Sequence, residues 1–176
     1  MSAKRAAMRR EQRERQKAEK KVSDVDRRAI KGRDIGREIA FYSAVNTLHR
    51  DFDFGKKRIK KLMDMCRNES SRFSFQGVHF VLEHYAEKIN KRLDDIDVVE
   101  IAENDMIYAI NMSKSFVTAL SVICTVLNDG FGMSSNDKGT GRIDKIIDYA
   151  CFDFIRILTG ETDYQKEMQE VAKLCG

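Results

Sequence analysis

The stretch DMIYAINMSKSFVTALSVICTVLN, residues 105–128, decides the fold class of this chain of 176 residues. Its apolar side chains recur every three or four positions, at Ile107, Ile110, Val117, Leu120, Ile123, Cys124 and Leu127. That recurrence matches the 3.6-residue turn of an α-helix with one buried face. Asn104 or Asp105 can supply the N-cap, and Asp129-Gly130 can end the helix. The stretch therefore predicts a long core helix.

Five further segments have the same helical period. They cover residues 34–50, 56–67, 75–93, 142–158 and 163–175. The last is the weakest, although Thr162 and Gln165 can form a capping box for it and Gly160 suits the end of the helix before it. No segment alternates apolar and polar residues for long enough to predict a strand. We therefore expect an all-α bundle of about six helices. Its core is predicted to include Ile39, Leu48, Leu120 and Ile147.

The N-terminal segment differs in composition from the rest of the chain. Residues 4–21, KRAAMRREQRERQKAEKK, hold nine basic and three acidic residues and no Leu, Ile or aromatic residue. Such a segment cannot bury an apolar face, so residues 1–22 are predicted to be an extended or helical arm, and 23–176 a single helical domain. The arm cations expected to contact a partner are Arg9, Arg10, Arg13, Arg15, Lys17, Lys20 and Lys21.

Two turns of the chain resemble each other. LHRDFDFGKKRIKKLMD begins at residue 48 and LNDGFG begins at residue 127, and each passes from a Leu through an acidic turn to Phe-Gly and then to Arg-Ile-x-Lys. The second copy first inserts the Gly-rich segment 133–141, which is predicted to be a flexible loop. A duplication would give two three-helix units, 25–93 and 98–175. Chance similarity between helical strings is the alternative.

The segment AFYSAVNTLHRDFDFGKKRIKKLMD, together with the basic arm, resembles small, mostly uncharacterised proteins encoded by phages and prophages of Gram-positive bacteria. Those proteins have a basic start, a helix, a turn of the form LHxxFGFGxxR and a following helix. The matching positions here are Leu48, His49, Phe52, Phe54, Gly55 and Arg58. Asp53 stands where a Gly is common. The resemblance implies an accessory protein of the bacterial cytoplasm and implies no particular activity.

A second basic cluster, KKRIKK, covers residues 56–61. On a helix Lys56 and Lys60 lie one turn apart, as do Lys57 and Lys61, and like charges at this spacing weaken a helix slightly. The helix dipole also disfavours cations at a helix N-terminus. A phosphate-binding patch would explain the cluster, and so would a solvated face that balances acids elsewhere. The predicted contact residues are Lys56, Lys57, Arg58, Lys60 and Lys61.

Two strings have the letters of a catalytic motif without its spacing. HRDFDFG, residues 49–55, overlaps the HRD and DFG of protein kinases, which lie on separate loops. Asp51 and Asp53 are instead predicted to shape a turn, with Gly55 at positive φ. GFGMSSNDKGTG, residues 130–141, fits neither GxxxxGK[ST] nor GxGxxG.

The remaining polar clusters predict neither a metal site nor a cofactor. His79 and Glu83 can share a helix face, but two ligands do not make a zinc site. Four acidic residues at helical spacing are predicted to be solvated, namely Glu100, Glu103, Asp144 and Asp148. The cysteines form no CxxC and are expected to be reduced, mostly buried thiols. They are Cys66, Cys124, Cys151 and Cys175.

These features favour a non-enzymatic, phage-type interaction protein. We expect it to bind nucleic acid, or a nucleic-acid-containing host machine, through the arm and the 56–61 cluster. The alternative is a protein-binding inhibitor of a host enzyme or defence system, and a small helical enzyme is the third class. The sequence has neither an apolar run near ~20 residues nor a signal-peptide core, so a cytoplasmic location without membrane contact is expected.

Overall fold

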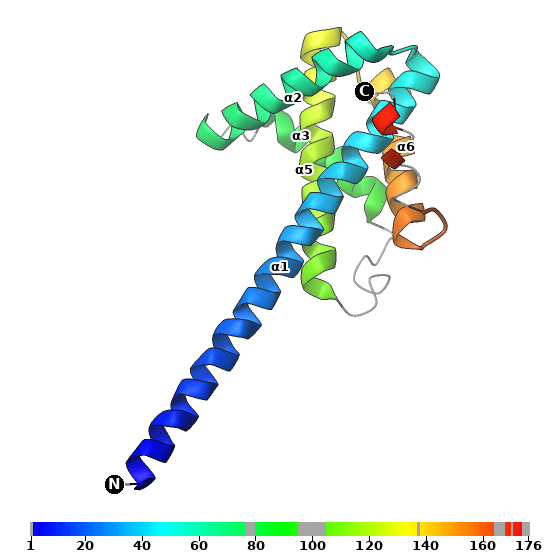
Figure 1. The fold of residues 1–176 in the computed structure, drawn as a ribbon. Helices are drawn as coiled ribbons and strands as arrows, with labels where there is room; N and C mark the ends of the chain where they lie inside the picture. The colour runs from blue at the N-terminus through cyan, green and yellow to red at the C-terminus, as the bar shows by residue number, and fades with distance from the viewer. Residues whose placement is uncertain are drawn as a thin grey trace.

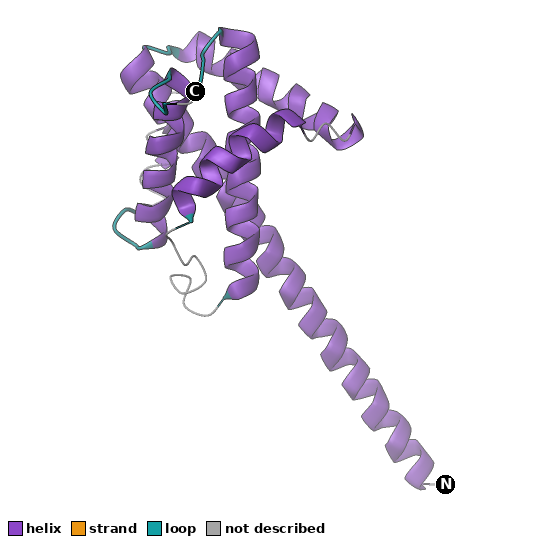
Figure 2. Cartoon of the chain, turned by 180° about the vertical axis from the view of Figure 1, so that it is seen from behind, coloured by secondary structure: helices purple, strands orange, loops and turns teal. Residues whose placement is uncertain are grey.

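The chain is all-α, as predicted. The computed structural model describes residues 2–76, 80–94, 105–136, 138–163, 168–169 and 171–173, with side chains for these ranges outside 2–23 and 70–82. Within them no strand occurs, and Figure 1 and Figure 2 draw the described elements as helices. The helices are α1 (Ser2–Phe52), α2 (Lys56–Gln76), α3 (Phe80–Leu93), α5 (Met106–Phe131) and α6 (Arg142–Leu158).

Helix α1 joins the predicted arm and the predicted core segment 34–50 into one helix of 51 residues. At 1.5 Å per residue it is about 75 Å long. Its N-terminal part projects away from the rest of the molecule, whereas its C-terminal part lies across α5 and α6 (Figure 1). The arm is therefore helical, and its direction is tied to that of a core helix.

Two glycines one turn apart set how closely α1 approaches α5. A Cβ on Gly32 would lie 2.4 Å from the Tyr108 carbonyl oxygen, and a Cβ on Gly36 would lie 2.1 Å from that of Met112. Only residues without a side chain allow this contact between backbones. The Gly32-x-x-x-Gly36 pair thus fixes the point at which α1 leaves the core.

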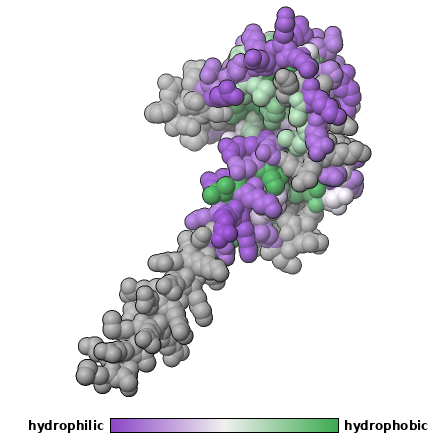
Figure 3. Space-filling view, viewed as in Figure 1, coloured by the Kyte–Doolittle hydropathy of each residue, from purple (hydrophilic) through white to green (hydrophobic). Residues whose placement is uncertain are grey.

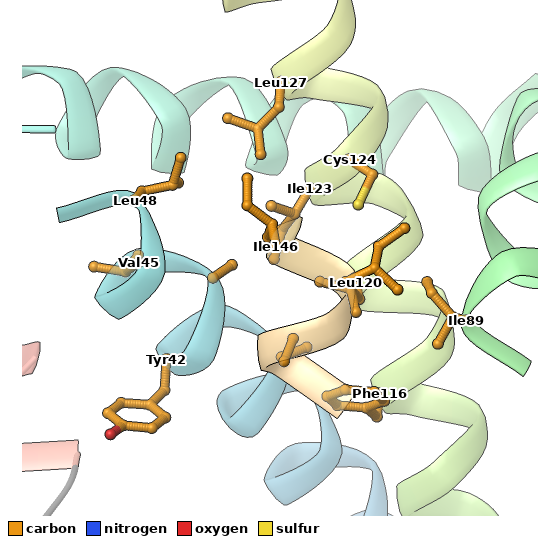
Figure 4. Packing of buried hydrophobic residues seen from close by; sticks show 14 of the residues in the cluster. Tyr42, Val45, Leu48, Ile89, Phe116, Leu120, Ile123, Cys124, Leu127 and Ile146 are labelled. Atoms are coloured by element: carbon orange, nitrogen blue, oxygen red, sulfur yellow. The ribbon is translucent and has the colours of Figure 1, made fainter. Parts of the chain in front are cut away.

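Helix α5 is the centre of the core, with α1, α2 and α3 packed against it and α6 packed mainly against α1 (Figure 4). The four core residues named from the sequence are fully buried, so that prediction is confirmed; they are Ile39, Leu48, Leu120 and Ile147. The stripe on α5 is wrong at Ile110, which is 37% exposed, and Phe116 is buried and stacks on Phe154 at 4.2 Å. The helices of the first candidate unit pack on α5, so both units share one core.

Several helix boundaries differ from the predicted ones. Helix α2 continues to Gln76 and α3 begins at Phe80, so the prediction of one helix over 75–93 is wrong at its start. Asp105 caps α5 as expected, because its side chain accepts a hydrogen bond from the Tyr108 N–H. The end expected at Asp129-Gly130 is wrong, since α5 continues to Phe131. The predicted capping box at Thr162 and Gln165 lies partly outside the described residues.

Helix α5 is also long and apolar enough, by length and composition, to cross a membrane. The expectation that no apolar run approaches such a length is therefore wrong for this helix. Within the described structure, 61% of its most apolar stretch is buried against the other helices. The core helix of a globular protein has the same properties.

Candidate nucleic-acid interface

The 56–61 cluster forms the first turns of α2, and its five cations are exposed. Helix α2 begins after Gly55, whose carbonyl accepts the N–H groups of Arg58 and Ile59. Its first turn contains no acidic residue. In the described part of the chain, none of the five cations belongs to an ion pair, unlike Arg27, Arg28, Arg37 and Arg50 on α1. We call the side chains of Lys56, Lys57, Arg58, Lys60 and Lys61 the α2 patch.

The turn that leads into the α2 patch has the same backbone geometry as the turn after α5. The Phe54 N–H reaches back to the Leu48 carbonyl at 3.1 Å, and the Met133 N–H reaches back to that of Leu127 at 3.1 Å. In each turn the preceding residue is left-handed, with φ of 53° at Asp53 and 62° at Gly132. Each helix thus ends in a turn that is closed by a backbone hydrogen bond spanning six residues, directly after a left-handed residue.

The geometry corrects one prediction about the first turn. Asp53, and not Gly55, has the positive φ. An L side chain is strained in that conformation, so Asp53 stands at a position that a glycine would occupy at lower cost. The His49 ring also stabilises this turn, since its Nδ1 lies 3.1 Å from the Phe54 carbonyl oxygen.

The two turns face each other and enclose a cavity of about 640 Å³, which we call the twin-turn cavity. The rings of Phe54 and Phe131, one from each turn, lie 5.2 Å apart. Arg58 and Arg142, the arginines of the two Arg-Ile-x-Lys strings, both line the cavity and are exposed. The cavity is lined by Asp51, Phe52, Phe54, Arg58, Phe131, Met133 and Arg142.

The aromatic walls of the twin-turn cavity carry cations on their faces. The Arg58 guanidinium lies 5.4 Å from the Phe54 ring centre, and the Lys61 ammonium lies 5.2 Å from that of Phe131. Such contacts are attractive and hold the cationic groups in place. Two residues of the α2 patch are therefore positioned by the turns.

The single carboxylate of the cavity lining is neutralised. Asp51 accepts hydrogen bonds from Arg50 at 2.9 Å and pairs with Lys145 at 3.2 Å. The hydrogen bond from Arg50, followed by that from Lys145, lowers the pKa of Asp51 below its usual value. The Asp51 carboxylate thus bonds to two cations and not to the backbone of the turn, whereas Asp53 bends the turn through its left-handed backbone. No metal-binding group of three His, Cys, Asp or Glu residues occurs among the described residues.

The arm cations lie at the opposite end of α1 from the α2 patch. The backbone of this part of the chain is helical, and the arm side chains named from the sequence lie outside the described residues. From Lys21 to Phe52 the helix rises by about 47 Å. The structure therefore does not bring the two predicted basic clusters together; a duplex that touches both must span about 14 base pairs.

A second basic cavity of about 390 Å³ was not predicted from the sequence. It lies between the end of α3 and the 133–141 segment, and its cations are Lys88, Lys91, Arg92 and Lys138. Lys88 pairs with Asp144 and Arg92 pairs with Asp148, so half of this charge is already neutralised. The α2 patch remains the denser group of cations without acidic partners in the described residues.

Asp144 contradicts the prediction of a solvated carboxylate, because it is fully buried. It accepts hydrogen bonds from the backbone N–H groups of Asn136 and Gly141 at 2.9 Å and from the Ser135 hydroxyl. Burial by itself would raise the pKa of Asp144, but these hydrogen bonds and the Lys88 ammonium lower it. The described part of 133–141 is thus anchored to the start of α6, and the prediction of a flexible loop is wrong there.

The described cysteines are unsuited to nucleophilic chemistry. Cys124 and Cys151 are buried and Cys66 is half-buried. Burial raises the pKa of Cys66 and of Cys151 to about 12, and it also raises the pKa of Cys124. These thiols stay protonated at neutral pH, whereas the thiolate is the reactive form. His79 and the thiol of Cys175 lie outside the described residues, and Glu83, the other member of the pair considered from the sequence, is exposed.

Comparison of the chain with protein-family models, with curated proteins and with solved structures finds no match. The function therefore has to be inferred from the residues and their geometry.

Proposed function

We propose that this protein is a non-enzymatic nucleic-acid-binding protein that contacts phosphates through its arm and its α2 patch. The observation that carries the proposal is the α2 patch itself. Five exposed cations share two helical turns, and none of them has an acidic partner in the described part of the chain. This arrangement weakens the helix, and phosphates would supply the missing negative charge.

The arm would act as a second phosphate-binding element. Nine basic residues in 4–21 can neutralise phosphates and release counterions, which favours binding without any particular base sequence. Two clusters on one ligand also raise the overall affinity, provided that the ligand is long enough to reach both. Duplexes longer than about 14 base pairs can contact both clusters at once. Their affinity should therefore rise by more than the larger number of binding positions on a longer duplex explains.

The resemblance to phage and prophage accessory proteins supports a bacterial cytoplasm as the place of action. There the ligand would be DNA, RNA or a ribonucleoprotein of the host.

The test is a binding titration on duplex DNA and on RNA at several salt concentrations. The arm variant changes Arg9, Arg10, Arg13 and Lys17 to Gln, and the patch variant changes Lys56, Lys57, Lys60 and Lys61 to Gln. With about four to six phosphate contacts per cluster, each cluster should contribute about −4 to −5 to the log–log salt slope on a long duplex. The arm variant should lose most of the slope that the arm contributes, and the patch variant most of the slope that the α2 patch contributes.

A third variant controls for net charge. It changes four exposed arginines that are each paired with an aspartate, namely Arg27, Arg28, Arg37 and Arg67. It removes as much charge as the patch variant, and its slope should stay close to that of the wild type. The proposal would be refuted if the patch variant and this control lost the same share of the salt slope. It would also be refuted if the wild type bound no nucleic acid at ~50 mM salt.

A second function, docking on a host protein as an inhibitor, is favoured by the outer face of α6. Phe152 is 56% exposed and Tyr149 is 36% exposed, and both rings are covered by guanidinium groups, from Arg156 and Arg50 respectively. Aromatic residues and arginine are enriched at the centres of protein interfaces. If nucleic-acid binding fails and Phe152→Ala abolishes capture of a host protein from nuclease-treated lysate, this function replaces the first.

A further inference from the structure

The twin-turn cavity has features that phosphate binding by the α2 patch does not require. Phosphate contacts need only cations at the surface, whereas this open cavity has a volume of about 640 Å³ and an aromatic lining beside its two arginines. Cavities that bind small molecules have volumes of about 300–1,000 Å³. It is formed by two segments almost 80 residues apart in the sequence, and a backbone hydrogen bond closes the turn in each of them.

The cavity lining has two chemically different parts. Phe52 and Phe131 are half-buried and provide aromatic surface beside the cations that contact their rings, whereas Phe54 is buried behind them. Arg58 and Arg142 come from different helices and remain exposed, in reach of an anion at the edge of the cavity. A flat apolar group that carries a phosphate matches this division.

Asp51 argues against inorganic phosphate as the occupant. Its carboxylate lines the cavity, and although Arg50 and Lys145 neutralise it, it adds no attraction for a second anion. A carboxylate can instead accept a hydrogen bond from the amino group of a nucleobase. The lining thus combines what single-strand binding sites use: cations for the backbone, aromatic faces for stacking, and one acceptor.

We propose that the twin-turn cavity takes one unpaired nucleotide of a single-stranded nucleic acid. The base lies against the phenylalanines, and its phosphate lies between Arg58 and Arg142. This inference rests on the proposed function and makes it more specific: a duplex keeps its bases stacked and can contact only the arm and the α2 patch, whereas a single strand can also fill the cavity.

The experiment compares a 20-nucleotide single strand with a 20-base-pair duplex by fluorescence anisotropy at one salt concentration. Arg142→Gln lies outside the α2 patch, so it should weaken single-strand binding about tenfold and duplex binding less than twofold. Phe131→Leu keeps an apolar side chain but removes a stacking face, and it should have the same selective effect. Arg37→Gln, an exposed arginine paired with Asp34, is the matched control and should change neither affinity.

A spectroscopic measurement reports on stacking directly. A strand with one 2-aminopurine should lose fluorescence on binding to the wild type, and this quenching should be absent with Phe131→Leu. Melting temperatures of all variants check that they fold. Millimolar mononucleotide should compete with the strand only weakly, because the α2 patch contributes to strand binding.

The outcomes separate the two proposals. If the wild type retains neither ligand, the proposed function fails and this inference fails with it. If Arg142→Gln and Phe131→Leu affect strand and duplex equally, or affect neither, the cavity does not hold a nucleotide but the proposed function stands. If a mononucleotide binds the cavity tightly and displaces the strand fully, the cavity is a site for a free nucleotide and the single-strand assignment is wrong.

Discussion

The two halves of α1 differ in composition and in how close they lie to the other helices (Figure 1). From Gly32 onward the helix packs against α5, and Ile39, Val45 and Leu48 are buried. Before residue 23 the same helix carries nine of its cations and no Leu, Ile or aromatic side chain. One continuous backbone therefore belongs both to the core and to a predicted ligand-binding arm. A continuous helix can therefore contain one part that stabilises the fold and another part that is predicted only to bind a ligand.

The largest loss of stability is expected from a substitution at the point where α1 crosses α5. Gly36→Leu should destabilise the protein by more than about 4 kcal/mol, because its side chain would meet the backbone of α5 and neither helix can yield easily. Gly55→Leu is the control, since a Cβ there meets nothing within 4 Å and its cost should not exceed about 1 kcal/mol. Urea unfolding measures both. Similar costs at the two glycines would show that the crossing does not anchor α1.

Core truncations along the inner half should come next in size. Ile39→Ala and Leu48→Ala should each cost about 2–5 kcal/mol, as should Leu120→Ala and Ile147→Ala in the helices that they contact. Ile30, just outside the crossing, is 48% exposed, so Ile30→Ala should cost less than about 1 kcal/mol. Near-neutral results at two of the four core positions would refute the packing described for α1.

Asp144 offers a smaller change that leaves α1 untouched. Asp144→Asn should cost about 3 kcal/mol at pH 7, because Lys88 and two backbone N–H groups lose a buried anionic acceptor. The folded pKa of Asp144 lies below the usual 3.8, so its stabilising effect is present above that pH and is lost as the pH falls through the folded value. Urea unfolding at pH 7 and at pH 3 measures this effect. The difference in the free energy of unfolding between wild type and variant should be smaller at pH 3.

The smallest effect on stability is expected at the outer half. Deletion of residues 1–21 should leave the melting temperature nearly unchanged, because the segment has no side chain suited to a core. The same deletion should remove the arm's share of the salt slope in duplex binding. A fall of more than a few degrees in a thermal melt would mean that the arm stabilises the body, and the two halves of α1 would not be separable.

The sequence predicts one half of α1 much better than the details of its anchoring. An apolar stripe identifies Ile39 and Leu48 as buried because helical period and burial are directly linked. Gly32 and Gly36 have no such signal, since a glycine favours close packing only when the opposing backbone is known. The start of the helix predicted over 75–93 is misplaced because the apolar period alone gives no sign that residues 75 and 76 end the preceding helix.

The candidate site could be predicted only in part. The α2 patch is visible as a run of charge, and the repeated Arg-Ile-x-Lys strings pointed to related turns. That Arg58 and Arg142 would line the same cavity depends on how α2 and α6 are placed around α1 and α5, which no local pattern encodes. Asp144 was misjudged for a similar reason, because its spacing on α6 does not reveal the loop that folds over it.

The projecting part of α1 also bears on how fast a ligand is found. A compact body of about 150 residues has a radius of gyration of about 15 Å. The first residues of the arm lie about 45 Å from the crossing at Gly32, measured along a rigid helix. A polyanion would thus meet the arm tip well before it meets the body. Loss of the tip should slow the association rate more than it hastens dissociation, as expected for an electrostatic antenna.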